Sequence, residues 1–435
     1  MRISFYTLGC KVNQFETHLL SDRFLHKGFE VVEFGQEADV YIVNTCCVTA
    51  KAAYQARQVL RRIRREQPNA KIVATGCYAQ VYPNEIFDSL EGQVCIVGND
   101  QKHRIPEMAE SQEDCVRICV GDITKVQDVP QHLLSKPHGR TRAFMRIQDG
   151  CNAFCSYCIV PYARGRSRSL PPKLVKKQIS IFKEHGVKEI VITGINLASW
   201  GKDLPTRTSF RHLMEDILPS FPNIRFRISS QEPTEIGIEM LKFLSAAPNF
   251  CHHFHVPLQS GSKTILKKMN RKYTPEQFAV VIEKIKSYLP DAAIGIDVMA
   301  GFPGETRSEF DKTLTFLESI PLTYIHAFPY SPRPGTLAFG WKNDCSKQEK
   351  NRRVKELIEL GRGKKEEFYK RAVGMEAELL IEQKDKESGL WKGLTSNYIS
   401  VRLSEPIIDK DMANKLVKVK LLRSETTEFL YGKII

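Results

Sequence analysis

Short apolar runs, each followed by a helical pattern, dominate the first hundred residues. Residues 3–8, 40–44 and 72–75 are apolar and too short for helices, and an amphipathic helical period follows each of them. This alternation is typical of a parallel sheet with helical crossovers. We therefore predict an α/β chain that begins with a βα domain over residues 1–112, followed by a polar linker over 113–136.

A second βα series is predicted over residues 137–367, and it ends in a long amphipathic helix at about 346–373. Residues 371–435 then alternate short apolar segments with turns, which predicts a small antiparallel β-barrel of OB-like size. Six strands in the second series fit an incomplete (β/α)6 barrel better than the eight-stranded form. The expected strands are residues 142–148, 189–193, 225–229, 253–258, 293–299 and 324–329.

Cys151, Cys155 and Cys158 form the motif C-N-A-F-C-S-Y-C, which is the strongest chemical signal in the chain. Three thiolates at this C-x3-C-x2-C spacing can hold three irons of a [4Fe–4S] cube and leave the fourth iron without a protein ligand. A zinc site is the weaker alternative, because it needs a fourth Cys or His nearby in paired C-x2-C spacing. The next histidine, His185, lies in a predicted helix.

Three further cysteines, Cys10, Cys46 and Cys77, close the three predicted strands of the first domain. The carboxyl ends of parallel strands line one crevice of an open sheet, so these thiols should converge on a second cluster site. The alternative is that they are small buried residues that pack at strand ends. Cys47 neighbours Cys46, and spacing alone does not choose between the two.

Charge points to a phosphate-rich partner. The net charge is +14, and residues 51–71 and 136–170 each carry seven Lys or Arg against one acidic residue. Such clusters are the electrostatic footprint of nucleic-acid binding. The basic stretch 342–373 also contains many acidic residues, as solvated helix faces do. Trp391 and Tyr398 in the small barrel are either base-stacking or core aromatics.

Several features bear on the compartment. Twelve cysteines without an export signal favour metal ligation. No stretch approaches the roughly 18 apolar residues of a membrane span, and the first residues lack a signal-peptide pattern. We expect a cytoplasmic protein with no membrane partner.

The cluster motif, with Tyr157 before its last cysteine, resembles the radical S-adenosylmethionine (SAM) enzymes. The motifs N-T-C-C-V-T, G-C-Y-A-Q and C-I-V-P-Y-A-R-G-R-S-R-S extend the resemblance to the methylthiotransferases, over essentially the whole chain and including a C-terminal RNA-binding TRAM module. T-L-G-C-K-V-N-Q is similar to the group acting on threonylcarbamoyladenosine in tRNA. The isopentenyladenosine group more often reads G-C-Q-M-N, and the group acting on a ribosomal protein reads G-C-P-K-N. Trp200 departs from the usual Tyr of T-G-x5-Y-G.

The resemblance implies sulfur insertion at C2 of the modified adenosine at tRNA position 37, followed by methylation. It implies two [4Fe–4S] clusters, with SAM as radical source and methyl donor. The catalytic, SAM-binding cluster would be held by Cys151, Cys155 and Cys158, and the auxiliary cluster by Cys10, Cys46 and Cys77. The family pattern N-T-C-x-V-T assigns the ligand to Cys46 and leaves Cys47 in the variable place. Further SAM contacts would come from Tyr157, Thr193, Gly194, Ser229 and Asp297.

The expected partners are the anticodon stem-loop of tRNA, an electron donor such as flavodoxin or ferredoxin, and a sulfur donor. Two alternatives stay open. One is the same reaction on isopentenyladenosine, which would use the same cysteines. The other is a non-catalytic RNA-binding iron–sulfur protein, although a pure binder has no need of an open iron. The sequence does not identify either donor, the set of tRNAs or the oligomeric state.

Overall fold

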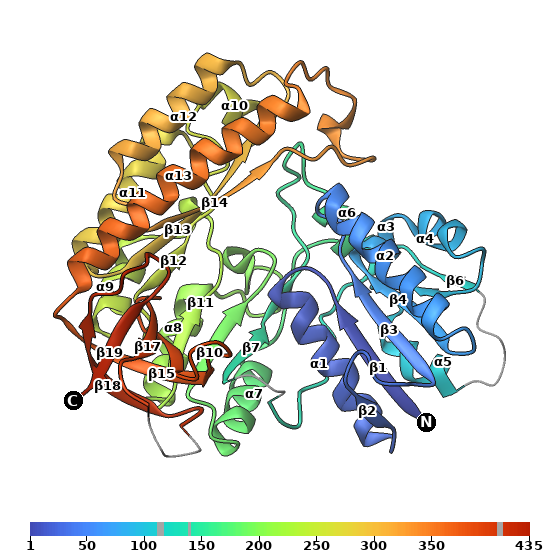
Figure 1. Ribbon diagram of the computed structural model, residues 1–435. Helices are drawn as coiled ribbons and strands as arrows, with labels where there is room; N and C mark the ends of the chain where they lie inside the picture. Colours follow the sequence, from blue (N-terminus) through green and yellow to red (C-terminus); the bar gives the residue numbers. More distant parts are fainter. Residues whose placement is uncertain (111–116, 138–140, 407–411) are drawn as a thin grey trace.

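The computed structural model describes residues 1–110, 117–137, 141–406 and 412–435. Its three parts follow one another along the chain, from the N-terminal sheet through a central barrel to a small C-terminal barrel (Figure 1). No helix within these ranges is both long and apolar enough to cross a bilayer.

The N-terminal domain is a six-stranded, fully parallel sheet in the order β2-β1-β3-β4-β5-β6. The central strand β3 is buried along its whole length, as its apolar run predicts. The sheet extends into the segment expected as a linker, because β6 pairs with β5. The elements are β1 (Arg2–Thr7), α1 (Lys11–His26), β2 (Glu30–Val32), β3 (Val40–Thr45), α2 (Ala50–Glu66), β4 (Lys71–Gly76), α3 (Cys77–Val81), α4 (Pro83–Ser89), β5 (Cys95–Val97), η1 (Lys102–Arg104), α5 (Ile105–Glu110), β6 (Arg117–Cys119) and η2 (Ile123–Lys125).

The central domain confirms the incomplete (β/α)6 barrel. Six parallel strands form two sheets, β7-β10-β11 and β12-β13-β14, and single bridges connect β11 with the chain of β12. The elements are β7 (Arg142–Arg146), β8 (Gln148–Asp149), α6 (Val160–Arg164), β9 (Arg168–Ser169), α7 (Pro172–Glu184), β10 (Glu189–Thr193), η3 (Leu197–Ser199), α8 (Phe210–Ser220), β11 (Arg225–Ile228), η4 (Pro233–Glu235), α9 (Ile238–Ala246), β12 (His253–His255), α10 (Lys263–Lys268), α11 (Pro275–Tyr288), β13 (Ala293–Ala300), α12 (Arg307–Ser319), β14 (Tyr324–Pro329) and η5 (Leu337–Gly340).

The C-terminal part confirms the long helix and the small barrel. Helix α13 (Lys347–Ala372) is N-capped by Ser346, whose hydroxyl accepts from the Glu349 amide, and it packs against β14. The closed barrel has the order β15-β16-β17-β19-β18. Its strands are β15 (Glu376–Lys384), β16 (Trp391–Thr395), β17 (Ser400–Leu403), β18 (Leu416–Leu422) and β19 (Leu430–Ile434).

The two aromatic residues of the small barrel belong to packed regions. Trp391 is buried in the barrel core. Tyr398 stacks on His253 of the central barrel, with ring centroids 4.1 Å apart, and the Arg227 guanidinium lies over the Tyr398 ring at 5.2 Å from its centroid. The core alternative is therefore confirmed for Trp391, and Tyr398 joins two domains instead of offering a free stacking surface.

The small barrel docks at the amino ends of the central strands. Arg225 Nη2 donates to the carbonyl of Leu394 at 3.2 Å, and Arg227 Nη1 donates to that of Ser396 at 3.0 Å. The buried Glu189 carboxylate pairs with both guanidinium groups. Because Glu189 and Arg225 are the first residues of β10 and β11, the small barrel lies at the end opposite the cysteine loop.

Candidate active site

The N-terminal cysteines lie where three neighbouring strands end. Cys10 follows β1, Cys46 follows β3 and Cys77 follows β4, and these strands are adjacent in the sheet. Cys46 and Cys77 are buried, whereas Cys10 keeps exposed surface. The pKa of the Cys46 thiol is raised to about 12, mainly by burial and in part by the nearby Cys77 and Cys10. The three sulfurs are thus close enough to influence one another.

Two glycines permit this approach. Gly9 has φ +98°, and a Cβ on it would lie 2.9 Å from the Cβ of Cys46. Gly76 has φ +95°, and a Cβ on it would lie 2.4 Å from the Thr45 carbonyl oxygen. Both positions therefore require glycine, for its positive φ and for its missing side chain. This requirement explains why a glycine precedes both Cys10 and Cys77.

The two adjacent cysteines of the segment N-T-C-C-V-T lie in different surroundings. Cys47 is fully buried in the apolar core of the domain, whereas Cys46 lies against Gly9 at the sheet edge. Thr49 then caps α2, its hydroxyl accepting from the amide of Ala52 at 3.1 Å. This placement favours Cys46 over Cys47 as a metal ligand.

The second cysteine set surrounds a cavity of about 320 Å³ at the carboxyl ends of the barrel strands. Cys151, Cys155 and Cys158 all line it. Arg271 Nη1 donates to Cys155 Sγ at 3.4 Å, and the Ala153 amide donates to Cys151 Sγ at 3.4 Å. Both donors favour thiolates at these positions. Val48 and Thr49 of the N-terminal domain line the same cavity, so the segment that follows Cys46 and Cys47 faces the space that the second cysteine set surrounds.

The other expected cofactor contacts divide into two groups. Tyr157 and Asp297 line the cavity, and the Tyr157 ring meets Phe302 edge-on with centroids 6.3 Å apart. The wall does not include Thr193, Gly194 or Ser229; the neighbouring residues Asn196 and Ser230 are there in their place. Strand-end positions could be predicted from the sequence, but which residue of each turn faces the cavity could not.

Unpaired polar atoms around the cavity fit a polar cofactor. Asn196 Oδ1 and Gln259 Oε1, both from residues of the cavity wall, are buried without a hydrogen-bond partner among the residues that the structure describes. A buried polar atom without a partner costs about 1–3 kcal/mol, so such groups are normally satisfied by a ligand or water. Together with three convergent thiols, these residues suit a [4Fe–4S] cluster with SAM bound beside it.

Asp297 is held as a carboxylate by two histidines. His255 Nε2 lies 3.0 Å from Asp297 Oδ1, and His326 Nδ1 lies 3.4 Å from the same oxygen. Burial acts to raise the pKa of Asp297, but the hydrogen bonds from the two imidazoles outweigh it and leave that pKa well below its ordinary value. The side chain can therefore accept hydrogen bonds within the cavity.

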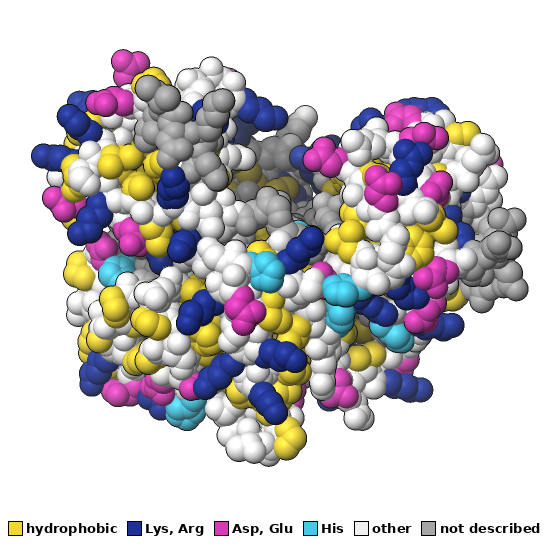
Figure 2. All heavy atoms as spheres, turned by 90° about the horizontal axis from the view of Figure 1, so that it is seen from below, with side chains coloured by type: hydrophobic (Ala, Val, Ile, Leu, Met, Phe, Trp, Pro, Cys, Tyr) yellow, Lys and Arg dark blue, Asp and Glu magenta, His cyan; other side chains and the backbone are white. Residues whose placement is uncertain are grey.

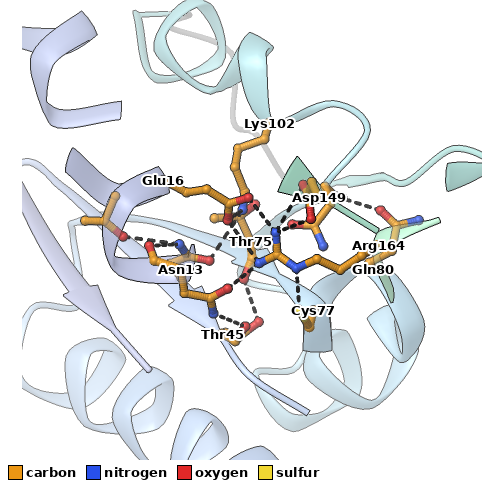
Figure 3. A network of polar contacts seen from close by, with 12 residues as sticks. Asn13, Glu16, Thr45, Thr75, Cys77, Gln80, Lys102, Asp149 and Arg164 are labelled. Atoms are coloured by element: carbon orange, nitrogen blue, oxygen red, sulfur yellow. Dashed lines mark hydrogen bonds and ion pairs between the residues drawn. The ribbon is translucent and has the colours of Figure 1, made fainter. Parts of the chain in front are cut away.

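A buried polar network surrounds Arg164 and reaches Cys77 of the N-terminal set, and composition alone did not reveal it (Figure 3). Arg146, Arg164 and Arg168 are buried and surround the carboxylates of Glu16 and Asp149. The expectation that the whole basic run 136–170 forms a phosphate-binding surface is wrong for these three arginines. Their partners Glu16 and Asp149 compensate part of their charge inside the protein. Glu16 lies in α1, far away in the sequence, so a local charge count does not include it.

Comparisons with known proteins agree with this architecture. Residues 2–98 match the family described as uncharacterized protein family UPF0004, and residues 145–317 match the radical SAM superfamily. The chain is 37% identical to the threonylcarbamoyladenosine tRNA methylthiotransferase MtaB of Aquifex aeolicus, over 92% of this chain and 96% of that protein. It is 38% identical to the Bacillus subtilis protein of the same name, over 97% and 94%.

A second group of relatives carries another substrate name. The tRNA-2-methylthio-N(6)-dimethylallyladenosine synthase of Thermus thermophilus is 33% identical, over 90% of this chain and 84% of its own length. Among solved structures, the radical SAM methyltransferase TsrM from Kitasatospora setae superposes with a TM-score of 0.57 at 14% identity, covering 78% of this chain and 77% of that one, which is a likeness of fold. With full-length relatives above 30% identity and both cysteine sets in place, the chain belongs to the family of radical SAM methylthiotransferases, of the MtaB type.

Proposed function

We propose that this protein methylthiolates C2 of N6-threonylcarbamoyladenosine at position 37 of tRNA. The observation that carries the proposal is that Cys151, Cys155 and Cys158 line one cavity together with Val48 and Thr49, which closely follow Cys46 in the other domain. Two cluster sites in adjoining domains can divide radical formation from sulfur delivery.

The chain's own residues have distinct tasks in this reaction. Cys151, Cys155 and Cys158 would hold the cluster that binds SAM, and Cys10, Cys46 and Cys77 would hold the auxiliary cluster. When bound, these groups supply the adenosyl radical that removes the C2 hydrogen, and the sulfur that a second SAM then methylates. Tyr157 and Phe302 form an aromatic wall, and Asp297 offers a fixed acceptor inside the cavity.

One half-buried cation favours the threonylcarbamoyl substituent. Lys11 follows Cys10 at the start of α1, and no carboxylate of a described residue pairs with its ammonium group. Burial lowers its pKa first, as do the charges of Arg142 and Arg227, while Cys10 and Asp297 raise it. Helix α1, which Lys11 begins, packs against β7 of the central barrel. A substrate carboxylate, which threonylcarbamoyl has and isopentenyl lacks, would supply the missing partner.

The decisive experiment is mass spectrometry of tRNA nucleosides from a deletion strain, with and without the plasmid-borne gene. The proposal expects loss of 2-methylthio-N6-threonylcarbamoyladenosine and accumulation of its unthiolated precursor. Loss of the methylthio group from isopentenyladenosine would assign the other substrate. If neither modification changes, while the purified protein still binds tRNA, the non-catalytic RNA-binding alternative holds.

The proposal also includes the partners and the compartment. Because the reaction needs electrons and sulfur, the protein would work with a low-potential electron donor such as flavodoxin or ferredoxin and with a separate sulfur donor. Its compartment would be the cytoplasm. It would bind the anticodon stem-loop, where the target nucleoside lies unpaired.

A further inference from the structure

All three nitrogens of the Arg164 guanidinium group donate hydrogen bonds. Nη1 donates to Glu16 Oε1 at 2.6 Å and to Asp149 Oδ1 at 3.2 Å, and Nη2 donates to Asn13 Oδ1 and to Glu16 Oε2. Nε donates to Cys77 Sγ at 3.4 Å. A guanidinium has five N–H groups in a fixed plane, so these five contacts determine its position (Figure 3).

The same residue is mechanically tied to the other cysteine set. Arg164 ends α6, which begins two residues after Cys158, and the carbonyl of the next residue, Gly165, accepts from the Cys151 amide at 3.0 Å. Helix α6 packs against α3, the helix that Cys77 begins. Arg164 thus connects the loop of one cysteine set with a thiol of the other through a short, buried path.

The charges around Arg164 are not balanced by the side chains present. Four cationic groups, those of Arg146, Arg164, Arg168 and Lys102, share only two carboxylates, Glu16 and Asp149. The three arginines and both acids are at most 5% exposed. Buried charge in excess requires a counter-charge nearby. A [4Fe–4S] cube held by Cys77 and its neighbours would supply it.

We propose that Arg164 is a positioning residue for the auxiliary cluster, raising its reduction potential through an N–H···S bond to Cys77 and fixing its place relative to the radical cluster. Hydrogen bonds to cluster sulfurs and local net charge are the protein's main means of setting such a potential. The inference rests on the two clusters of the family and is independent of the modified nucleoside.

Glu16 shows why Arg164 is more than an ion-pair partner. Without Arg164, Glu16 keeps Lys102 at 2.6 Å and Arg146 at 3.0 Å, so its carboxylate stays paired. Cys77 has no such second partner, because Arg164 is the one side chain of the described residues that donates a hydrogen bond to its sulfur. Replacing Arg164 therefore affects the thiol more than it affects the carboxylates.

The test uses full-length protein in which Cys151, Cys155 and Cys158 are Ala, so that one cluster contributes to the signal. After anaerobic reconstitution, iron content and the midpoint potential are measured by EPR-monitored redox titration for Arg164→Gln, Arg164→Lys and Arg168→Gln. Arg168 is the matched control, since it is equally buried and contacts Asp149 and the Arg164 carbonyl but no thiol.

Arg164→Gln should shift the potential to a lower value, or lose the four irons, while Arg168→Gln does neither. Arg164→Lys keeps the positive charge but removes the planar guanidinium group and its set of hydrogen bonds. It should lower the midpoint potential by a smaller amount. Equal shifts in Arg164→Gln and Arg168→Gln would mean that net charge alone acts and would overturn the inference. So would an unchanged potential with full iron content in Arg164→Gln. If Arg164→Gln does not fold, an unchanged potential in Arg164→Lys decides against the inference in the same way.

Discussion

At the residue scale, we expect the two cysteine sets to have separable tasks, because they belong to different domains. Wild-type protein should bind about eight irons, from two four-iron cubes. Cys10→Ala, Cys46→Ala or Cys77→Ala should abolish methylthiolation and retain 5′-deoxyadenosine release from SAM. Cys151→Ala should abolish both. Iron analysis and product chromatography under reducing conditions measure these outcomes.

The matched control for those variants is Cys47→Ala, because Cys47 adjoins Cys46 but points into the core. It should keep both activities and the full iron content, with a small loss of stability from the missing sulfur. A wild-type value near four irons would contradict the two-cluster assignment. So would the loss of SAM cleavage in the N-terminal variants while their remaining cluster is intact.

Lys11 provides a residue-scale test of the substrate. If its ammonium binds the threonyl carboxylate, Lys11→Gln removes a charged hydrogen bond worth about 1.5–3 kcal/mol. The expected result is a KM for threonylcarbamoyl-modified tRNA that rises roughly tenfold or more, since each 1.4 kcal/mol is a factor of about ten. Steady-state kinetics on modified and unmodified anticodon stem-loops measure it.

The unmodified stem-loop serves as the reference for Lys11→Gln, because it lacks the carboxylate. Its affinity should change little in the variant. An equal loss of affinity for both RNAs would instead assign Lys11 to general phosphate attraction, and the wild-type enzyme's preference for carboxylated RNA would then need another residue.

At the element scale, strands and helices were predictable because each rests on a local pattern. The buried strand β3 is one unbroken apolar run, and α13 shows its amphipathic period and its Ser346 cap in sequence. The linker was predicted less well, since β6 has only three residues and forms by pairing with β5. The Arg164 network could not be predicted from local sequence patterns, because its partners Glu16 and Cys77 come from elements far away along the chain.

The basic residues of helix α2 differ in how exposed they are to a tRNA. Arg64 donates to three backbone carbonyls and Arg57 pairs with Glu85, so both stabilise the fold. Arg62 and Arg65 are 57% and 78% exposed at their side chains, and their ion pairs with Glu66, at 3.0 and 3.9 Å, are surface pairs that contribute little. Their reversal to Glu should weaken tRNA binding and flatten its salt dependence, because fewer counterions are released. Filter binding over a range of salt measures the slope.

Helix α13 offers the control for that experiment. Arg352 and Lys355 are exposed, but acidic residues such as Glu349 and Glu356 are mixed among them. Reversing both changes the net charge by the same amount and should leave the slope nearly unchanged. Figure 2 shows a face on which basic and acidic side chains likewise lie beside each other. Equal effects of the two double variants would make tRNA attraction a property of net charge alone.

At the scale of the whole molecule, the small barrel is part of the catalytic scaffold. Its carbonyls accept from Arg225 and Arg227, and Tyr398 stacks on His253 inside the end of the central barrel. Removing it would expose the Arg225–Arg227–Glu189 cluster and leave these donors without their acceptors. A tRNA-binding assay alone does not test the connection between the two barrels, since a loss of affinity could come from either one.

Deletion of residues 374–435 should therefore lower the melting temperature of the remaining chain, beyond any effect on tRNA. Each buried donor left unpaired costs about 1–3 kcal/mol, and several are affected. Differential scanning calorimetry of the iron-loaded proteins measures the change, with Lys392→Ala as a control at a side chain outside this interface that pairs with Asp385 within the small barrel. An unchanged melting temperature in the truncated chain would mean that the small barrel is an independent appendage. Because the arginine contacts span the boundary between the two barrels, we expect the central barrel to depend on the C-terminal residues for its stability, and tRNA binding and folding to be lost together.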